Sequence, residues 1–218
     1  MEQELIVRRV HTDHVEAEQV SALMDENAIE WHSVDQLNWK ESYPYAPEVK
    51  FRVAHNGGNI LVEYRVNEET IRAVAPSDNG RVWEDSCCEM FLLSPAGGTY
   101  YNFECNCAAT LLIEYGTGRG NRERADAEIV RKVKRWSSNG NQPFDERMAG
   151  GEWRMALVIP VACLFKDKVT SLSGLVTQGN FYKCGDKQRK PHFLSWHKIV
   201  TETPDFHRPD FFGRMRFE

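Results

Sequence analysis

The sequence predicts an all-β protein, an antiparallel β-sandwich of the jelly-roll type with few short helices. Short runs of alternating apolar and polar residues recur along the chain, turn residues separate them, and helical periodicity is scarce. About nine or ten strands of this length are typical of a sandwich or jelly roll. At 218 residues we expect one domain over residues 1–218, with residues 1–30 as an N-terminal extension packed on it.

The first predicted elements are a short helical turn around residues 14–26 and a β-hairpin. The run VKFRVAH at 49–55 alternates, and NILVEYRV at 59–66 does the same. Between them Asn-Gly-Gly at 56–58 supplies the positive φ that a tight hairpin turn requires. These two runs therefore predict paired antiparallel strands.

A three-stranded meander is predicted in the middle of the chain. CCEMFLL at 87–93 leads through a Ser-Pro-Ala-Gly-Gly turn into TYYNFECNC at 99–107, and ATLLIEY at 109–115 continues the sheet. The glycine-rich and charged segment that follows, 116–126, is expected to be a polar loop. Residues 127–136 fit helix or strand by pattern, and their β-branched content favours a strand.

The last third of the chain continues with short strands. The run EWRMALVIP places Trp153, Met155, Leu157 and Ile159 on one face. A short helix or turn is expected at 160–165. Further strands are predicted at 152–160, 173–184, 192–199 and 212–218.

Charge and hydropathy exclude two classes of partner. The 27 Lys and Arg against 32 Asp and Glu give a net charge of −5, which argues against a nucleic-acid surface. No segment reaches the roughly 18–20 apolar residues that span a bilayer, so no membrane partner is expected. The first twenty residues lack the pattern of a signal peptide, and we therefore expect a cytoplasmic protein.

The six cysteines are expected to be reduced and mostly buried. Neighbouring residues in a strand point to opposite faces, so Cys87 and Cys88 are poorly placed to bind one metal ion. Cys105 and Cys107 share a face, but they share it with core aromatic residues. We therefore predict no metal site and no cofactor, while a metal or redox protein using these four cysteines is kept as an alternative.

Polar side chains occupy alternate positions of the central strands and therefore share one face of the predicted sheet. Asn102, Glu104 and Asn106 fall on the same face as Tyr100, and Glu89 on the partner strand could lie beside them. Short amide and carboxyl groups suit sugar hydroxyls, each of which donates and accepts hydrogen bonds. We predict that these groups bind a mono-, oligo- or polysaccharide.

Further candidates for sugar binding lie in predicted loops. Sugars present apolar C–H faces that stack on aromatic rings, and Trp83 lies in a turn-rich segment before the strand at 87–93. Lys183 and Asp186, in the polar segment near 181–193, are candidates for the rim of the site.

A catalytic alternative rests on two acids. Glu89 and Glu104 on adjacent strands could act as the carboxylate pair of a glycoside hydrolase. No other catalytic motif, such as G-x-S-x-G or H-E-x-x-H, is present in the sequence. Sugar binding without catalysis is therefore favoured.

Taken in order, several stretches resemble family 9 carbohydrate-binding modules, specifically the stand-alone bacterial members. They run from about residue 31 to the C-terminus and are YPYAPEVKFRVAH, NILVEYRVNEETIRA, VWEDSCCEMFL, YYNFECNCAATLL, GEWRMALVIP, NFYKCGDKQRKPHFLSW and TPDFHRPDFFGRMRFE. The resemblance implies a β-sandwich with a sugar-binding cleft, no catalytic activity and a link to carbohydrate catabolism. Members attached to xylanases take the reducing end of a glucan or xylan chain.

The resemblance also implies roles for individual residues. Trp83 and Phe206 match the two aromatic rings that clamp the sugar, and Glu89 matches an acid that contacts it. The chain departs from the family pattern in two places. DSCCE holds one residue more than usual before Glu89, and Glu104 stands where a basic residue is expected.

Overall fold

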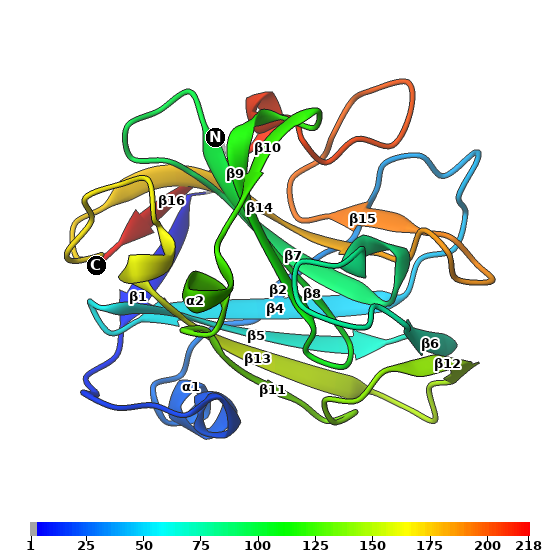
Figure 1. Cartoon of the computed structure of the whole chain (residues 1–218), viewed down its shortest axis with the longest axis horizontal. Coiled ribbons are helices and arrows are strands. Elements are labelled where there is room, and N and C mark those ends of the chain that lie inside the picture. The colour runs from blue at the N-terminus through cyan, green and yellow to red at the C-terminus, as the bar shows by residue number, and fades with distance from the viewer. Residues whose placement is uncertain (1–3) are drawn as a thin grey trace.

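Most of the strands belong to two sheets that are joined along one edge (Figure 1). The computed structural model describes residues 4–218. In spatial order the first sheet contains β10 (Asn121–Arg124), β9 (Leu111–Gly118), β8 (Tyr100–Asn106), β7 (Cys87–Leu93), β14 (Val176–Cys184), β16 (Gly213–Phe217) and β1 (Leu5–Arg9). Two short strands extend it beside β14, namely β15 (Phe193–Ser195) and β3 (Gln36–Leu37).

The second sheet continues from β1. Its order is β1, β4 (Glu48–His55), β5 (Asn59–Asn67), β13 (Trp153–Pro160) and β11 (Lys134–Ser137), with β2 (His32–Ser33) paired to β4. A separate ribbon pairs β6 (Thr70–Ala73) with β12 (Phe144–Met148). The helices are α1 (Val20–Glu26), α2 (Ala127–Val130) and the 3-10 turns Ala17–Gln19, Val82–Glu84, Val161–Cys163 and Pro209–Phe211. The predicted β-sandwich with few short helices is confirmed.

The strand that joins the two sheets was not predicted. Residues 5–7 pair in parallel with β16, and residues 8–9 pair in parallel with β4. The predicted N-terminal extension thus contributes a strand to both sheets. These two pairings are exceptions to the expected antiparallel arrangement.

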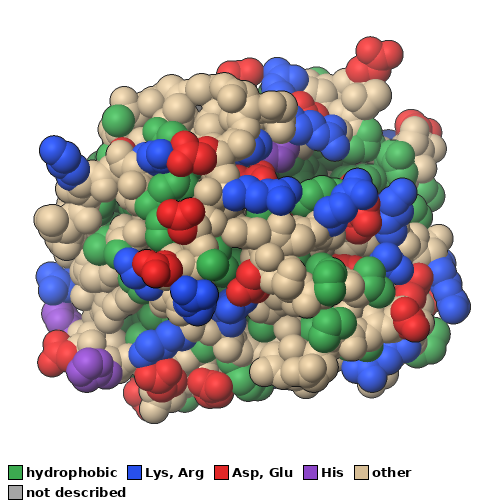
Figure 2. Space-filling view, viewed as in Figure 1, with side chains coloured by type: hydrophobic (Ala, Val, Ile, Leu, Met, Phe, Trp, Pro, Cys, Tyr) green, Lys and Arg blue, Asp and Glu red, His purple; other side chains and the backbone are tan. Residues whose placement is uncertain are grey.

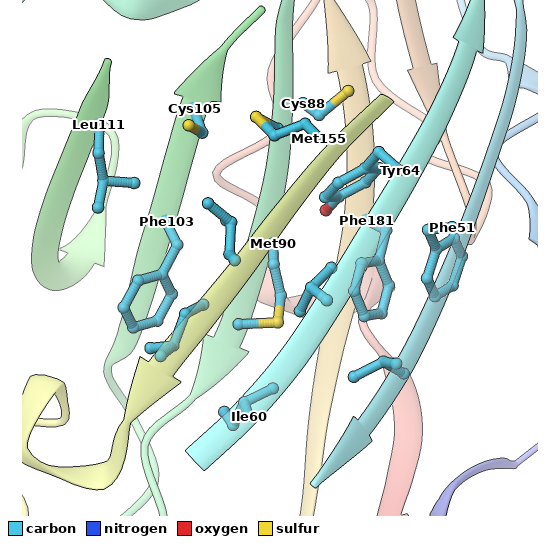
Figure 3. Close-up of a cluster of buried hydrophobic side chains, with 14 of the residues drawn as sticks. Phe51, Ile60, Tyr64, Cys88, Met90, Phe103, Cys105, Leu111, Met155 and Phe181 are labelled. Atoms are coloured by element: carbon cyan, nitrogen blue, oxygen red, sulfur yellow. The ribbon is translucent and has the colours of Figure 1, made fainter. Parts of the chain in front are cut away.

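The main hydrophobic core fills the space between the two sheets (Figure 3). Phe51 of β4 stacks on Phe181 of β14, with ring centroids 3.7 Å apart. Cys88 and Cys105 are buried in the same core, where the sequence parity places them. Trp153 is also in this core, on the face predicted for its strand.

Both predicted hairpins are confirmed. β4 and β5 pair antiparallel around Gly57, whose φ of +89° is the left-handed conformation expected of the Asn-Gly-Gly turn. β7, β8 and β9 form the predicted meander, with Glu89 directly opposite Glu104. The helical turn expected near 14–26 is present as α1 and the 3-10 turn before it.

Three local predictions were wrong. The segment 127–136 is not one strand, because 127–130 form a helical turn whose Val130 packs into the core before β11 begins. Part of the expected polar loop forms β10, which pairs with β9 although every side chain in it is polar. The strand expected at 192–199 covers only 193–195.

The outer faces of the two sheets differ. Helix α1 covers the outer face of the second sheet, where Val20 and Met24 pack on Leu61 and Val158. The outer face of the first sheet carries a second apolar cluster, which includes Phe91, Tyr100 and Tyr182. The candidate site lies on this cluster. None of the helices within residues 4–218 has the length and apolar character needed to cross a membrane.

Candidate functional site

A cleft of about 460 Å³ opens on the outer face of the first sheet. Five residues predicted from the sequence line it, namely Trp83, Glu89, Glu104, Asp186 and Phe206. In the space-filling view, Lys and Arg side chains gather around a recessed apolar area on the upper right (Figure 2). The cleft therefore combines aromatic rings, carboxyl groups and cations.

Trp83 projects from a 3-10 turn that is tied firmly to the sheet. Asp85, fully buried, accepts hydrogen bonds from the backbone amides of Val74 and Ala75 at 3.0 Å and from Asn106 Nδ2 at 2.9 Å. The Trp83 carbonyl accepts a hydrogen bond from the backbone N–H of Asp186 at 3.2 Å. The indole itself is half-buried and borders the cleft, as expected of a stacking platform.

Phe206, the second predicted aromatic residue, is part of a stack of rings. It lies parallel to Tyr182 with ring centroids 4.2 Å apart, and it also contacts Trp39 and Phe193. Only 8% of Phe206 is exposed. Its ring position is therefore fixed by packing, and the part that remains exposed faces the cleft.

Glu89 and Glu104 lie on the floor of the cleft and face each other across β7 and β8. Burial raises the pKa of Glu89 to about 8, although the Cys184 thiol donates a hydrogen bond to it at 3.0 Å. Burial and the facing Glu89 raise the pKa of Glu104 well above its usual range. Glu89 is thus mainly protonated at neutral pH and able to donate as well as accept hydrogen bonds, and the pKa of Glu104 is shifted in the same direction.

Asn102 lies beneath the floor and holds Glu104 in place. Its Nδ2 donates to Glu104 Oε1 at 2.7 Å, and its Oδ1 accepts a hydrogen bond from Arg122. Asn102 is completely buried and does not border the cleft. Its role in this structure is to position other groups, and the predicted direct contact with a ligand has no support from its placement.

Two other predicted residues lie away from the cleft. Asn106 is buried at the end of β8, where its Nδ2 donates to Asp85 and its Oδ1 accepts from the backbone amides of Ala108 and Thr110. Lys183 was expected on a solvated loop, but it lies in β14 with its side chain completely buried on the core side. Strand alternation explains this, because Cys184 takes the face of the cleft and Lys183 takes the opposite one. The structure therefore assigns neither residue to the site.

The cationic side of the cleft was missed. Arg119 and Arg122 border it, and Arg122 stacks on the Tyr100 ring at 4.2 Å. A basic residue was expected on the strand that carries Glu104, and β10 at the edge of the same sheet supplies one instead. The charged run Arg-Gly-Asn-Arg-Glu-Arg at 119–124 was the available signal, but it was interpreted as a solvated loop.

Asp186 and His207, which line the cleft, have shifted pKa values because both side chains are partly removed from water. Burial raises the pKa of Asp186 to about 6. Burial together with Arg122 and Arg119 lowers the pKa of His207 to about 3, so its imidazole is neutral. The Tyr100 hydroxyl and His207 Nδ1 are hydrogen bonded at 2.8 Å.

The four cysteines of the alternative metal site do not converge. Cys88, Cys105 and Cys107 are buried in the main core, whereas Cys87 belongs to the outer cluster. All six cysteines are free thiols in the structure. The prediction that Cys87 and Cys88 point to opposite faces of their strand is confirmed. These four side chains do not form a four-thiolate site.

The chain belongs to carbohydrate-binding family 9, whose family model matches residues 18–217. This assignment agrees with the sandwich, with the aromatic and carboxyl groups of the cleft, and with the resemblance found in the sequence. No match was found among curated proteins.

Solved structures of similar proteins agree with the fold. A crystal structure of a candidate carbohydrate-binding protein from Bacteroides uniformis is 50% identical and superposes with a TM-score of 0.95 over 100% of both chains. Family 9 modules from Caldicellulosiruptor kristjanssonii are more distant. The module in complex with cellotriose is 12% identical, with a TM-score of 0.59 over 99% of this chain and 94% of that one. The module in complex with glucose is 11% identical, with a TM-score of 0.57 over 98% and 95%.

Proposed function

We propose that this protein binds carbohydrate without cleaving it, in the cleft between Trp83 and Phe206. The observation that carries the proposal is the convergence of Trp83, Phe206 and Glu89 on one cleft, from three separate parts of the chain. Two rings offer surfaces for the C–H faces of a sugar, and the carboxyl group offers a hydrogen bond to its hydroxyls. The cleft volume of about 460 Å³ is in the range of small-molecule sites.

Arg122 supplies the clearest unmet hydrogen-bonding capacity in the cleft. Its Nε and Nη1 atoms are buried and have no hydrogen-bond acceptor within residues 4–218, although Glu114 lies 3.9 Å from Nε. Buried donors without a partner destabilise a protein unless a ligand or water satisfies them. A sugar hydroxyl is a suitable acceptor, and it would lie close to the neighbouring acid Glu104.

The proposed ligand is a gluco- or xylo-oligosaccharide, or the end of such a chain, taken up during carbohydrate catabolism. Two structures of family 9 modules from Caldicellulosiruptor kristjanssonii, which have the same fold, contain cellotriose and glucose. Because binding must desolvate several polar groups, we expect an affinity in roughly the micromolar to millimolar range.

Hydrolysis by Glu89 and Glu104 is less well supported. A retaining or inverting glycosidase needs one ionised carboxylate besides the acid. Here the two carboxyl groups are direct cross-strand neighbours, and burial raises the pKa of both. The shifts disfavour the ionised carboxylate that either mechanism needs.

The proposal is tested with a glycan screen followed by calorimetry. Trp83→Ala should abolish binding of the best ligand while changing the melting temperature little, since the indole is half-buried. Trp136→Phe, a substitution of an aromatic residue outside the cleft, is the matched control and should bind normally. Unchanged affinity of Trp83→Ala for a sugar that the wild-type protein binds would refute the assignment of this cleft.

A further inference from the structure

Three potential metal ligands meet at the floor of the cleft, where Glu89 and Cys184 line it and Cys87 lies buried beside them, and the proposed sugar binding does not require them all. Cys87 of β7 and Cys184 of β14 lie directly opposite each other in the sheet, and Glu89 is two residues along β7 on the same face. The two sulfur atoms and a carboxylate oxygen of Glu89 all lie within 4.8 Å of one another. All three side chains are buried.

The thiols have few other partners. Cys184 donates to Glu89 Oε1 at 3.0 Å and also lies 3.5 Å from the Trp83 carbonyl, and the two sulfur atoms lie within 4.8 Å of each other. The remaining acceptor for Cys87 is the Cys88 carbonyl at 3.8 Å, which is a long contact even for sulfur. The shortest of these contacts, between Cys184 and Glu89, joins two of the three groups.

Access to the site is available from the cleft. Cys184 and Glu89 both line it, so an ion can enter from solvent and keep one coordination position open to water or to a bound hydroxyl. Three protein ligands with one open position are the arrangement found in zinc sites that bind water or substrate at the fourth position.

We propose that Cys87, Glu89 and Cys184 bind a thiophilic divalent cation of the Zn²⁺ class. Two sulfurs and one oxygen match the ligands of zinc, whereas calcium and magnesium need six or more oxygen ligands. Tetrahedral zinc bonds of about 2.0–2.3 Å place its ligands roughly 3.5–3.8 Å apart, so small side-chain rotations would close the site. The inference does not depend on sugar binding.

Binding would be coupled to loss of protons. Burial raises the pKa of the Cys87 thiol to about 12 and that of Cys184 well above its usual range. The cation would displace these protons, leaving two thiolates and a carboxylate around a charge of +2. Arg119 and Arg122, which line the same cleft, would offset the remaining negative charge.

The test is a titration of metal-free protein with Cd²⁺ and with Zn²⁺, under a phosphine reductant and without sugar. We expect one ion per chain, a sulfur-to-cadmium charge-transfer band, and a higher melting temperature with Zn²⁺. Loss of a residue that only orients a metal ligand weakens metal binding by about 10–100-fold, so Cys87→Ala and Cys184→Ala, which remove a ligand, should each weaken binding by about 100-fold or more. Cys88→Ala, an equally buried neighbour on the opposite face, is the matched control and should keep the site.

Glu89→Gln tests the site without changing either cysteine, so its result does not depend on whether the cysteine variants fold. It should weaken Zn²⁺ binding, and the charge-transfer band should still form at higher metal concentration because both sulfurs remain. A wild-type protein that shows no such band with one equivalent of Cd²⁺ would overturn the inference. Equal weakening by Cys88→Ala and Cys184→Ala would also contradict it. Since no sugar is present, a negative result leaves the proposed sugar binding untouched.

Discussion

Replacement of Lys183 by Met should destabilise the protein strongly without removing a sugar contact. The ammonium group lies 3.0 Å from Glu68 Oε2, and both side chains are completely buried. Burial lowers the pKa of Lys183, but Glu68 and the neighbouring thiols raise it further, so the amine is charged. Met fills a similar volume and leaves the carboxylate of Glu68 without its counter-ion.

The expected cost follows from this geometry. Removing one partner of a buried ion pair costs about 3–5 kcal/mol, because the other charge stays buried. Glu68 also accepts hydrogen bonds from Ser86 Oγ and Trp153 Nε1. These bonds compensate in part for the lost ammonium group, so we expect a cost near the lower end of this range. For about 200 residues each kcal/mol lowers the melting temperature by about 2–4 °C, so the total loss is roughly 6–20 °C.

Urea denaturation of the wild type, Lys183→Met and the double variant Lys183→Met/Glu68→Gln measures the effect. The double variant should recover much of the loss, since neutral replacement of both partners of a buried pair is often nearly neutral. Folded Lys183→Met should bind sugar as the wild type does. A loss below about 1 kcal/mol, typical of a solvated pair, would refute the buried ion pair.

Other substitutions test the anchoring of the cleft, its titration and the core. Asp85→Ala should lose about 2–4 kcal/mol of unfolding free energy in urea and weaken sugar binding in calorimetry, because buried donors that hold the Trp83 turn lose their acceptor. The wild type should lose stability as pH rises from about 4.5 to about 8, because burial raises the folded pKa of Glu89 to about 8 and the folded state binds more protons there than the unfolded one. Glu89→Gln should make that profile shallower, while Glu104 and Asp186, whose pKa values burial also raises, account for the remaining slope; an unchanged slope would show that Glu89 does not contribute. Phe51→Ala should cost about 3–5 kcal/mol in urea denaturation, since its ring stacks fully buried on the facing sheet; a cost below 1 kcal/mol would contradict this packing.

Local alternation predicted the hairpins and the faces of the strands because its period of two is a property of the backbone itself. It separated Cys87 from Cys88 and grouped Glu104 with Asn102. Alternation does not say what covers a face, however. The polar face of β8 was expected at the surface, but Asn102 and Asn106 are completely buried beneath other segments.

The sequence pattern did not predict the pairing of strands that lie far apart along the chain. The parallel contacts of residues 5–9 join both ends of the chain, and no local pattern specifies them. The error at Lys183 has a similar origin, because its charge predicted solvent while its ion partner, Glu68, lies 115 residues earlier. Arg122 was missed because a strand at the edge of a sheet can be entirely polar when its side chains pair with neighbours or face a ligand.

The most direct test of the central claim is to follow the indole N–H signals of the six tryptophans by NMR during a sugar titration. Trp83 can be assigned by the signal that Trp83→Phe lacks. Trp31 is an internal reference, because it lines a separate cavity of about 260 Å³. Sugar binding in the proposed cleft predicts a saturable shift of the Trp83 signal while the Trp31 signal stays in place. A shift of Trp31 with no change at Trp83 would contradict the proposed site.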